Sequence, residues 1–163
     1  MRPAGCIVID ICSLLFYRHN ILVVTRNNRP AKKGVVLVPW YEFEGKRPQV
    51  GSQSFVHPEA VLIGDVTIGE KCFIGAGAVL RGDYGSIVIG NGSNVQENCV
   101  LHAQPGTVAV IEENVDIGHG SIIHGPCTIS AGVTVGMGSI ICDHCEVGRG
   151  SFIGAGSLLI PRT

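Results

Sequence analysis

The fold is decided by residues 111–159, which read in blocks of six as IEENVD IGHGSI IHGPCT ISAGVT VGMGSI ICDHCE VGRGSF IGAGSL L. Each block begins with isoleucine, valine or leucine, and its fifth residue is mostly serine or cysteine. A period of six fits neither the helical repeat nor the alternation of a single strand. It is typical of a parallel β-helix, in which each block forms one short strand and a turn.

The same period of six extends toward the N-terminus, with three residues inserted after Leu80 and four after Leu101. Three blocks make one triangular coil, and neighbouring coils lie ~4.8 Å apart. We therefore predict an all-β fold, a parallel β-helix shaped as a triangular prism, with both insertions leaving the coil as corner loops. Resemblance to hexapeptide-repeat proteins implies that the coil is left-handed, against the usual crossover rule. The earlier aliphatic anchors are Val56, Leu62, Ile68, Ile74, Leu80, Ile89, Val95 and Leu101.

Composition agrees with this fold and excludes several classes of protein. Glycine accounts for 23 of the 163 residues, charged residues for 15% and aromatic residues for 6%. Many glycines with few aromatics favour short strands and tight turns over a helix bundle. Residues 40–163 are acidic overall and carry no basic cluster, so we expect no nucleic-acid partner. No run of 18 apolar residues occurs, so we expect no membrane partner.

The chain divides into residues 1–39, an extension or leader of uncertain order, and the repeat domain, residues 40–163. The first part is basic, and three interpretations stay open: an organelle-targeting segment, a poorly ordered extension, or a strand pair from Ile7–Leu15 and Ile21–Thr25. The repeat is still running when the sequence stops at Thr163. We therefore expect a fragment truncated at the C-terminus, without the C-terminal helix usual for this kind of fold.

Four of the seven cysteines are predicted to be structural. They occupy the small inward position of a block, where a thiol packs as a small apolar group; these are Cys72, Cys99, Cys127 and Cys145. The run from Cys142 to Cys145 is spaced like a redox or zinc motif, but the register points Cys142 outward and Cys145 inward. No disulfide framework is evident, which favours a reducing compartment and a cytoplasmic location unless residues 1–39 direct import.

The period of six predicts that two histidines lie on the same face of the prism, one coil apart. His102 follows the anchor Leu101 and His124 follows the anchor Ile123, one full coil later. They should occupy one face with their Cα atoms ~5 Å apart, a spacing at which two imidazoles can share a metal ion. His119 lies on the preceding face and cannot easily reach them within its own chain. We therefore expect a homotrimer in which a neighbouring subunit supplies His119.

Three histidines and an open position are typical of a catalytic zinc site, although cobalt or iron also suits imidazole ligands. The same register places Arg81 one rung below His102 and Cys142 one rung above His124. Glu97 lies one rung below His119, where it could orient that ring, and Gln96 is its neighbour. Satisfied interface histidines without a metal are the alternative.

At these residues the sequence resembles the γ-class carbonic anhydrases and their relatives, which include accessory proteins of carnitine and phenylacetate metabolism. The resemblance covers about Tyr41 to Ile160. It implies a metal bound by His102, His119 and His124 across a trimer interface. It also implies an intersubunit ion pair between Arg81 and Asp83. The segments that carry it are Leu80-Arg81-Gly82-Asp83, Ser93-Asn94-Val95-Gln96-Glu97-Asn98, His102, Ile117-Gly118-His119-Gly120, Ile123-His124-Gly125 and Val135-Gly136-Met137-Gly138.

The implied activity is reversible hydration of CO2 to bicarbonate by a zinc-bound hydroxide, a lyase reaction in which Gln96 positions the hydroxide or the substrate. The sequence departs from the family pattern at three places: Glu97 replaces an aspartate, Tyr84 replaces an acid, and the insertion 103–107 holds no proton-shuttle glutamate. Two alternatives therefore stay open. One is an acyl-CoA thioesterase or acyltransferase of the hexapeptide-repeat superfamily, and the other is a non-catalytic scaffold whose trimer a metal stabilises.

Overall fold

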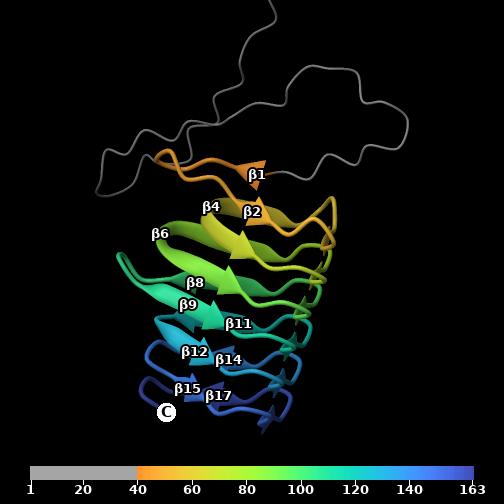
Figure 1. Ribbon diagram of the computed structural model, residues 1–163. Helices are drawn as coiled ribbons and strands as arrows, with labels where there is room; N and C mark the ends of the chain where they lie inside the picture. The colour runs from red at the N-terminus through yellow and green to blue at the C-terminus, as the bar shows by residue number, and fades with distance from the viewer. Residues whose placement is uncertain (1–39) are drawn as a thin grey trace, which may run out of the picture.

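A computed structural model describes residues 40–163, which wind as a left-handed parallel β-helix (Figure 1). The coils stack from β1 (Trp40–Tyr41) at one end to β17 (Leu158–Leu159) at the other. No helix occurs within residues 40–163, and so none there could cross a membrane. The predicted strand pair and targeting segment lie in residues 1–39, outside the described residues.

The prism has three faces, because the chain turns a corner after each short strand. The first face holds β8 (Val100–Ala103), β11 (Ile122–Gly125), β14 (Ile140–Ile141), β17 and the first halves of β4 (Val61–Ile68) and β6 (Val79–Ile89). The second face holds β2 (Gln49–Val50), β9 (Val108–Ile111), β12 (Cys127–Ile129), β15 (Glu146–Val147) and the second halves of β4 and β6. The third face holds β3 (Phe55–Val56), β5 (Phe73–Ile74), β7 (Asn94–Val95), β10 (Asp116–Ile117), β13 (Thr134–Val135) and β16 (Phe152–Ile153).

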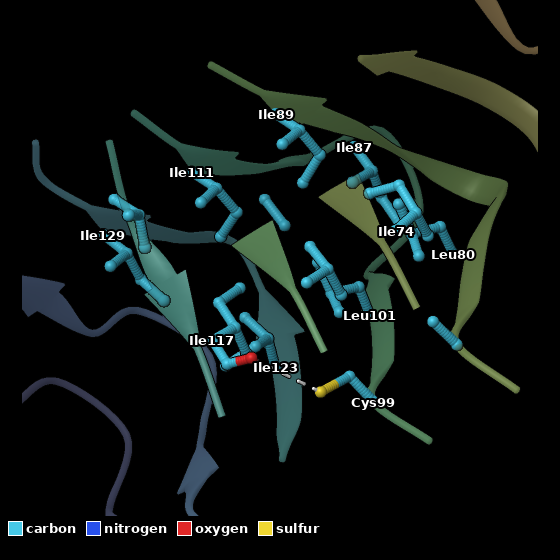
Figure 2. Close-up of a cluster of buried hydrophobic side chains, with 14 of the residues drawn as sticks. Ile74, Leu80, Ile87, Ile89, Cys99, Leu101, Ile111, Ile117, Ile123 and Ile129 are labelled. Atoms are coloured by element: carbon cyan, nitrogen blue, oxygen red, sulfur yellow. Dashed lines mark hydrogen bonds between the residues drawn. The ribbon is translucent and has the colours of Figure 1, made fainter. Parts of the chain in front are cut away.

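Register is kept from coil to coil, as the period of six requires. Every pairing between these strands is parallel, and anchor meets anchor: Leu101 pairs with Ile123, and Ile123 with Ile141. The anchors from Leu62 to Val147 are buried and form one continuous core, with Ile153 and Leu159 packed against its last coils. Figure 2 shows this stack of side chains directed into the prism. Each fully buried isoleucine or leucine contributes about 1.5–3 kcal/mol by leaving water.

The small inward residues form hydrogen bonds to backbone carbonyl groups at the corners of the coil. Ser93 donates its hydroxyl to the carbonyl of Glu112 at 2.7 Å, and Ser121 and Ser139 bond the carbonyls of the next coil in the same way. The thiol of Cys99 lies 3.2 Å from the Gly118 carbonyl oxygen and beside Ile117 and Ile123 (Figure 2). The four cysteines predicted to be structural are all buried and free, so this prediction is confirmed.

One of the two insertions differs from its prediction. The four residues after Leu101 form a corner loop between β8 and β9, as expected. The three residues after Leu80 form no loop and lie within the long strand β6. The pairing of β6 with β4 shifts between Gly64 and Val66, so an irregularity of the bulge type absorbs the extra residues. Tyr84, at this irregularity, is exposed.

Candidate functional site

The first face carries a ladder of side chains just beyond its anchors. Arg81 on β6 pairs with His102 on β8, and His102 pairs with His124 on β11. The centroids of the two imidazole rings lie 5.4 Å apart, with their planes tilted by 54°. The predicted placement of these two histidines, one rung apart on one face, is confirmed. The ladder exists because each of these residues directly follows an inward anchor.

His102 is the most enclosed of these histidines. Its Nε2 lies 3.0 Å from Arg81 Nη2 and 3.2 Å from Asp83 Oδ1, and the ring of Tyr84 stands edge-on with its centroid 6.0 Å away. Burial lowers the pKa of His102, and the Arg81 cation lowers it further. The neutral ring is therefore favoured, and its Nε2 can accept a hydrogen bond from Arg81. Arg81 also contacts Asp83 of its own chain, Nε to Oδ1 at 3.2 Å.

His119 lies in the turn that follows β10 on the third face, where it is exposed. Its Nδ1 is 2.7 Å from Glu97 Oε2, one rung below, as the register predicted. The side-chain oxygen of Gln96 accepts a hydrogen bond from the backbone N–H of His119 at 3.2 Å. A carboxylate that accepts the Nδ1 proton leaves the lone pair of Nε2 directed away, available for a proton or a metal ion.

A shallow groove on the third face begins at Gln96, which bonds the backbone of His119, although the His119 side chain does not itself line the groove. It runs from Gln96 past Gly118 and Gly136 to Met137 and Phe152. The two glycines form its floor, because a Cβ on Gly118 would lie 2.7 Å from the backbone nitrogen of Met137 in the next coil. The exposed side chains of Met137 and Phe152 make one end of the groove apolar. An oriented histidine beside a part-apolar groove is an arrangement suited to a general base acting on a bound acyl group.

The three histidines do not meet within one chain. Among residues 40–163 no group of three or more histidine, cysteine, aspartate or glutamate side chains is placed to hold a metal ion. Two imidazoles share the first face and the third lies on another face. The assignment of His119 to a neighbouring subunit therefore stays a prediction, as do the metal and the intersubunit role of Arg81 and Asp83.

Asp143 is a site residue that the sequence analysis missed. It lies in the turn after β14, and its Oδ1 is 3.9 Å from His124 Nδ1. Its position two residues after the anchor Ile141, one coil above His124, is the signal that could have found it.

Comparisons with known proteins agree with the fold. The sequence profile of the bacterial transferase hexapeptide family (six repeats) matches residues 47–82 and 126–161. A Bacillus cereus protein provisionally described as an acetyltransferase is similar in structure, with a TM-score of 0.75, 39% identity, and coverage of 77% of this chain and 73% of that one. A hexapeptide transferase family protein from Anaplasma phagocytophilum gives a TM-score of 0.72 and 42% identity over the same shares.

Among curated proteins, the carnitine operon protein CaiE of Escherichia coli O157:H7 is 49% identical over 90 residues, which are 55% of this chain and 45% of that protein. Its counterpart in Salmonella newport is 50% identical over 86 residues, which are 53% and 43% of the two chains. The chain thus spans less than half the length of these curated relatives. None of the relatives named here is described as a carbonic anhydrase, so the resemblance to the γ-class carbonic anhydrases stays a prediction.

Proposed function

The chain belongs to the hexapeptide-repeat transferase family, and on that premise we propose that it acts on acyl-CoA thioesters, with His119 as general base. The observation that carries this proposal is the 2.7 Å contact between His119 Nδ1 and Glu97 beside the third-face groove. Glu97 orients the ring and stabilises the imidazolium that forms when Nε2 takes a proton.

The reaction would be acyl transfer to a hydroxyl, an amine or water. His119 Nε2 removes a proton from the acceptor, whose oxygen or nitrogen forms a bond to the thioester carbonyl carbon. The carbon–sulfur bond then breaks, and the thiolate of CoA leaves and takes up the proton. The apolar end of the groove at Met137 and Phe152 would receive part of the substrate. The family and the provisional description of the Bacillus cereus protein support this class of reaction.

The test measures release of free CoA thiol from acetyl-CoA, with water alone and with hydroxyl or amine acceptors. His119→Ala should lower the rate about 10²–10⁴-fold, the usual contribution of a general base, and Glu97→Gln should lower it less. His57→Ala is the matched control, because His57 follows β3 on the same face, where its ring accepts a hydrogen bond from the backbone N–H of Glu59 and stands edge-on to Phe55. Full turnover by the His119→Ala variant would refute the assignment.

A second candidate function rests on the histidine ladder. His102 and His124 of one chain, with His119 of a neighbouring chain, are the donor set that suits zinc, and cobalt or iron would also fit. A bound zinc ion would supply Lewis acidity for the hydration of CO2. His102 and His124 would hold the ion, and Glu97 would keep the Nε2 lone pair of His119 free. Gln96 holds the backbone of His119 and would fix where that histidine lies.

Three measurements on one sample separate the candidates. Zinc content, CO2 hydration and thiol release are measured before and after chelation. Turnover of acetyl-CoA that survives chelation supports the base mechanism. CO2 hydration lost with the zinc, and lost again in His102→Ala and His124→Ala, supports the metal. A trimer that dissolves on chelation in a protein with neither activity supports the scaffold alternative.

We also propose that the first face is covered by a second copy of the chain in a homotrimer. The residues just before the anchors point outward there, and all of them are aliphatic: Val79, Val100, Ile122, Ile140 and Leu158. From Val100 to the C-terminal end of the face these side chains are exposed in a single chain, and Leu158 is 61% exposed. Such a continuous apolar ladder is typical of a protein interface. It lies beside His102 and His124, where the metal candidate requires a neighbouring subunit.

A further inference from the structure

The third-face groove carries one charged side chain, and that charge is negative. Asp116 lines the groove together with Gln96 and Thr134, whereas no lysine, arginine or histidine lines it. Asn94 Nδ2 donates a hydrogen bond to Asp116 Oδ1 at 3.2 Å, which holds the carboxylate and leaves Oδ2 for another donor. Within residues 40–163, no lysine or arginine forms an ion pair with Asp116. The groove therefore presents a negative charge that this part of the chain does not neutralise.

The strand register sets the order of the side chains along the groove. Asp116 pairs with Thr134 on the next coil, and Thr134 pairs with Phe152 on the coil after that. Each of the three directly precedes an inward anchor, so its side chain points outward, and two rungs of ~4.8 Å separate the first from the last. The side chain of Phe152 is 75% exposed. The groove is therefore acidic at one end and apolar at the other, with a hydroxyl group between them.

The floor and the size of the groove do not favour an anion or a large coenzyme. The backbone N–H groups of Gly118 and Gly136 already donate to the carbonyls of Val135 and Ile153 in the next coil, both at 2.8 Å. Anion sites are built from free N–H groups or cationic side chains. The groove has a volume of about 220 Å³, less than the ~300–1,000 Å³ of pockets that enclose drug-sized ligands. It therefore suits a small molecule.

We propose that the third-face groove binds a cationic amine that carries an apolar chain or ring. The ammonium group would lie at Asp116 and Thr134, and the apolar part would lie at Phe152. A primary ammonium group has three N–H donors, which a carboxylate and a hydroxyl can accept, and an aromatic side chain packs well against an apolar group. On the proposed function, on which this one assignment rests, the amine-bearing compound is the acyl acceptor. The charged group serves recognition.

The experiment measures binding to the full chain in the absence of acetyl-CoA. Phenylbutylamine and its neutral counterpart phenylbutanol are titrated at about pH 7 while NMR follows the amide signals of Gly118 and Gly136. The amine is cationic at this pH, as lysine is. It should bind about tenfold more tightly than the alcohol, because a hydrogen bond to a charged group is stronger than one to a neutral group. Asp116→Asn keeps the shape, removes the charge and should make the two affinities equal.

Three further variants separate the charge from the fold. Glu113→Gln removes an exposed carboxylate that pairs with Arg149 and does not line the groove, so it should leave the preference for the amine unchanged. Asp116→Glu keeps the charge and should also keep the preference. Phe152→Ala should weaken the binding of both probes alike, because it removes only the apolar contact.

Equal affinities of the two probes in the unaltered chain would overturn the proposal, as would a preference that survives Asp116→Asn. Signals that shift elsewhere but not at Gly118 and Gly136 would also overturn it. The proposed function is judged separately, by release of thiol from acetyl-CoA. Preferential binding of the amine to a chain that releases no thiol would sustain the groove site and count against the acyl-transfer reaction. Thiol release without any preference for the amine would do the reverse.

Discussion

At the scale of single residues, the proton affinity of His102 is set by its neighbours. Burial lowers its pKa most, and the Arg81 cation lowers it next. Arg81→Ala should therefore raise the pKa of His102, which an NMR titration of the ring protons measures. Lys46→Ala is the matched control, because it removes a cation that pairs with Asp65, at 2.9 Å, and that is not among the groups that shift the pKa of His102. A His102 pKa that stays constant or falls in the Arg81 variant would contradict the assigned cause.

The same shift predicts how stability depends on pH. Because the folded state lowers the pKa of His102, the neutral ring favours folding. This contribution is complete above the ordinary pKa of 6.5 and is lost as the pH falls from 6.5 toward the folded value. The free energy of unfolding should therefore decrease over that interval, and less steeply in the Arg81→Ala variant. Urea unfolding at a series of pH values measures both slopes, and parallel curves would contradict the linkage.

The thiols should differ sharply in reactivity. Burial, together with the nearby Cys145, raises the pKa of the Cys127 thiol to about 12, whereas Cys142 is half-buried and faces outward. Thiolate is the reactive form, so iodoacetamide should modify Cys142 in the folded protein and spare Cys127 until unfolding. Peptide mass spectrometry after a timed exposure gives the order. Equal rates at the two cysteines would show that the inward stack opens readily.

At the scale of the strand and corner, close stacking of coils should make an alanine substitution destabilising at Gly136 but harmless at the equivalent Gly148. A Cβ on Gly136 would lie 2.4 Å from the backbone nitrogen of Ala155, whereas one on Gly148 would meet nothing closer than the Ser151 hydroxyl at 3.8 Å. Both glycines directly follow a valine anchor. Gly136→Ala should cost about 1–3 kcal/mol through overpacking. Gly148→Ala should be neutral or stabilise by up to about 1 kcal/mol.

Chemical denaturation of the two variants tests this pair. A lower midpoint for Gly136→Ala with an unchanged denaturant slope is the expected result. Equal midpoints for the two alanine variants would mean that the coils move apart at little cost, and that the stacking distance does not restrict the side chain at this corner.

The strands were predictable from the sequence wherever the six-residue period was unbroken. Anchor positions, the inward cysteines and the rung that joins His102 to His124 follow from counting residues. The insertion after Leu80 was placed wrongly because counting shows only that residues were added. Whether they form a loop or lie within a strand depends on the alternation from Val79 to Ile89, whose inward residues stay buried across the irregularity.

Side chains that reach across a coil could not be predicted by counting. Asp143 accepts a hydrogen bond from the side chain of Gln104, which is 39 residues away in the sequence, and lies 3.9 Å from the His124 ring. The sequence places Asp143 at a corner but does not give the direction of its carboxylate. The Glu97–His119 contact was found because both residues occupy the same position on adjacent rungs. Contacts within the ladder are therefore predictable, and those between a ladder and a loop are not.

At the scale of the whole molecule, the first face should hold the subunits together. Ile140→Glu places a charge in the middle of the outward aliphatic ladder, between Ile122 and Leu158, and should convert a trimer into monomers. Thr67→Glu is the control, because Thr67 is exposed on the second face between Gln49 and Val88. Size-exclusion chromatography with light scattering measures the mass. A trimer that survives Ile140→Glu would place the interface on another face.

The strict pairing of anchor with anchor also determines how such a chain can change length. Duplication of three consecutive blocks would add one complete coil and return every later residue to its former face, so the new rung would copy its template. Duplication of a single block would rotate everything beyond it by one face, and a block duplicated between His102 and His124 would separate the two histidines. Growth by whole coils is thus the route by which proteins of this architecture can lengthen while a working site is preserved.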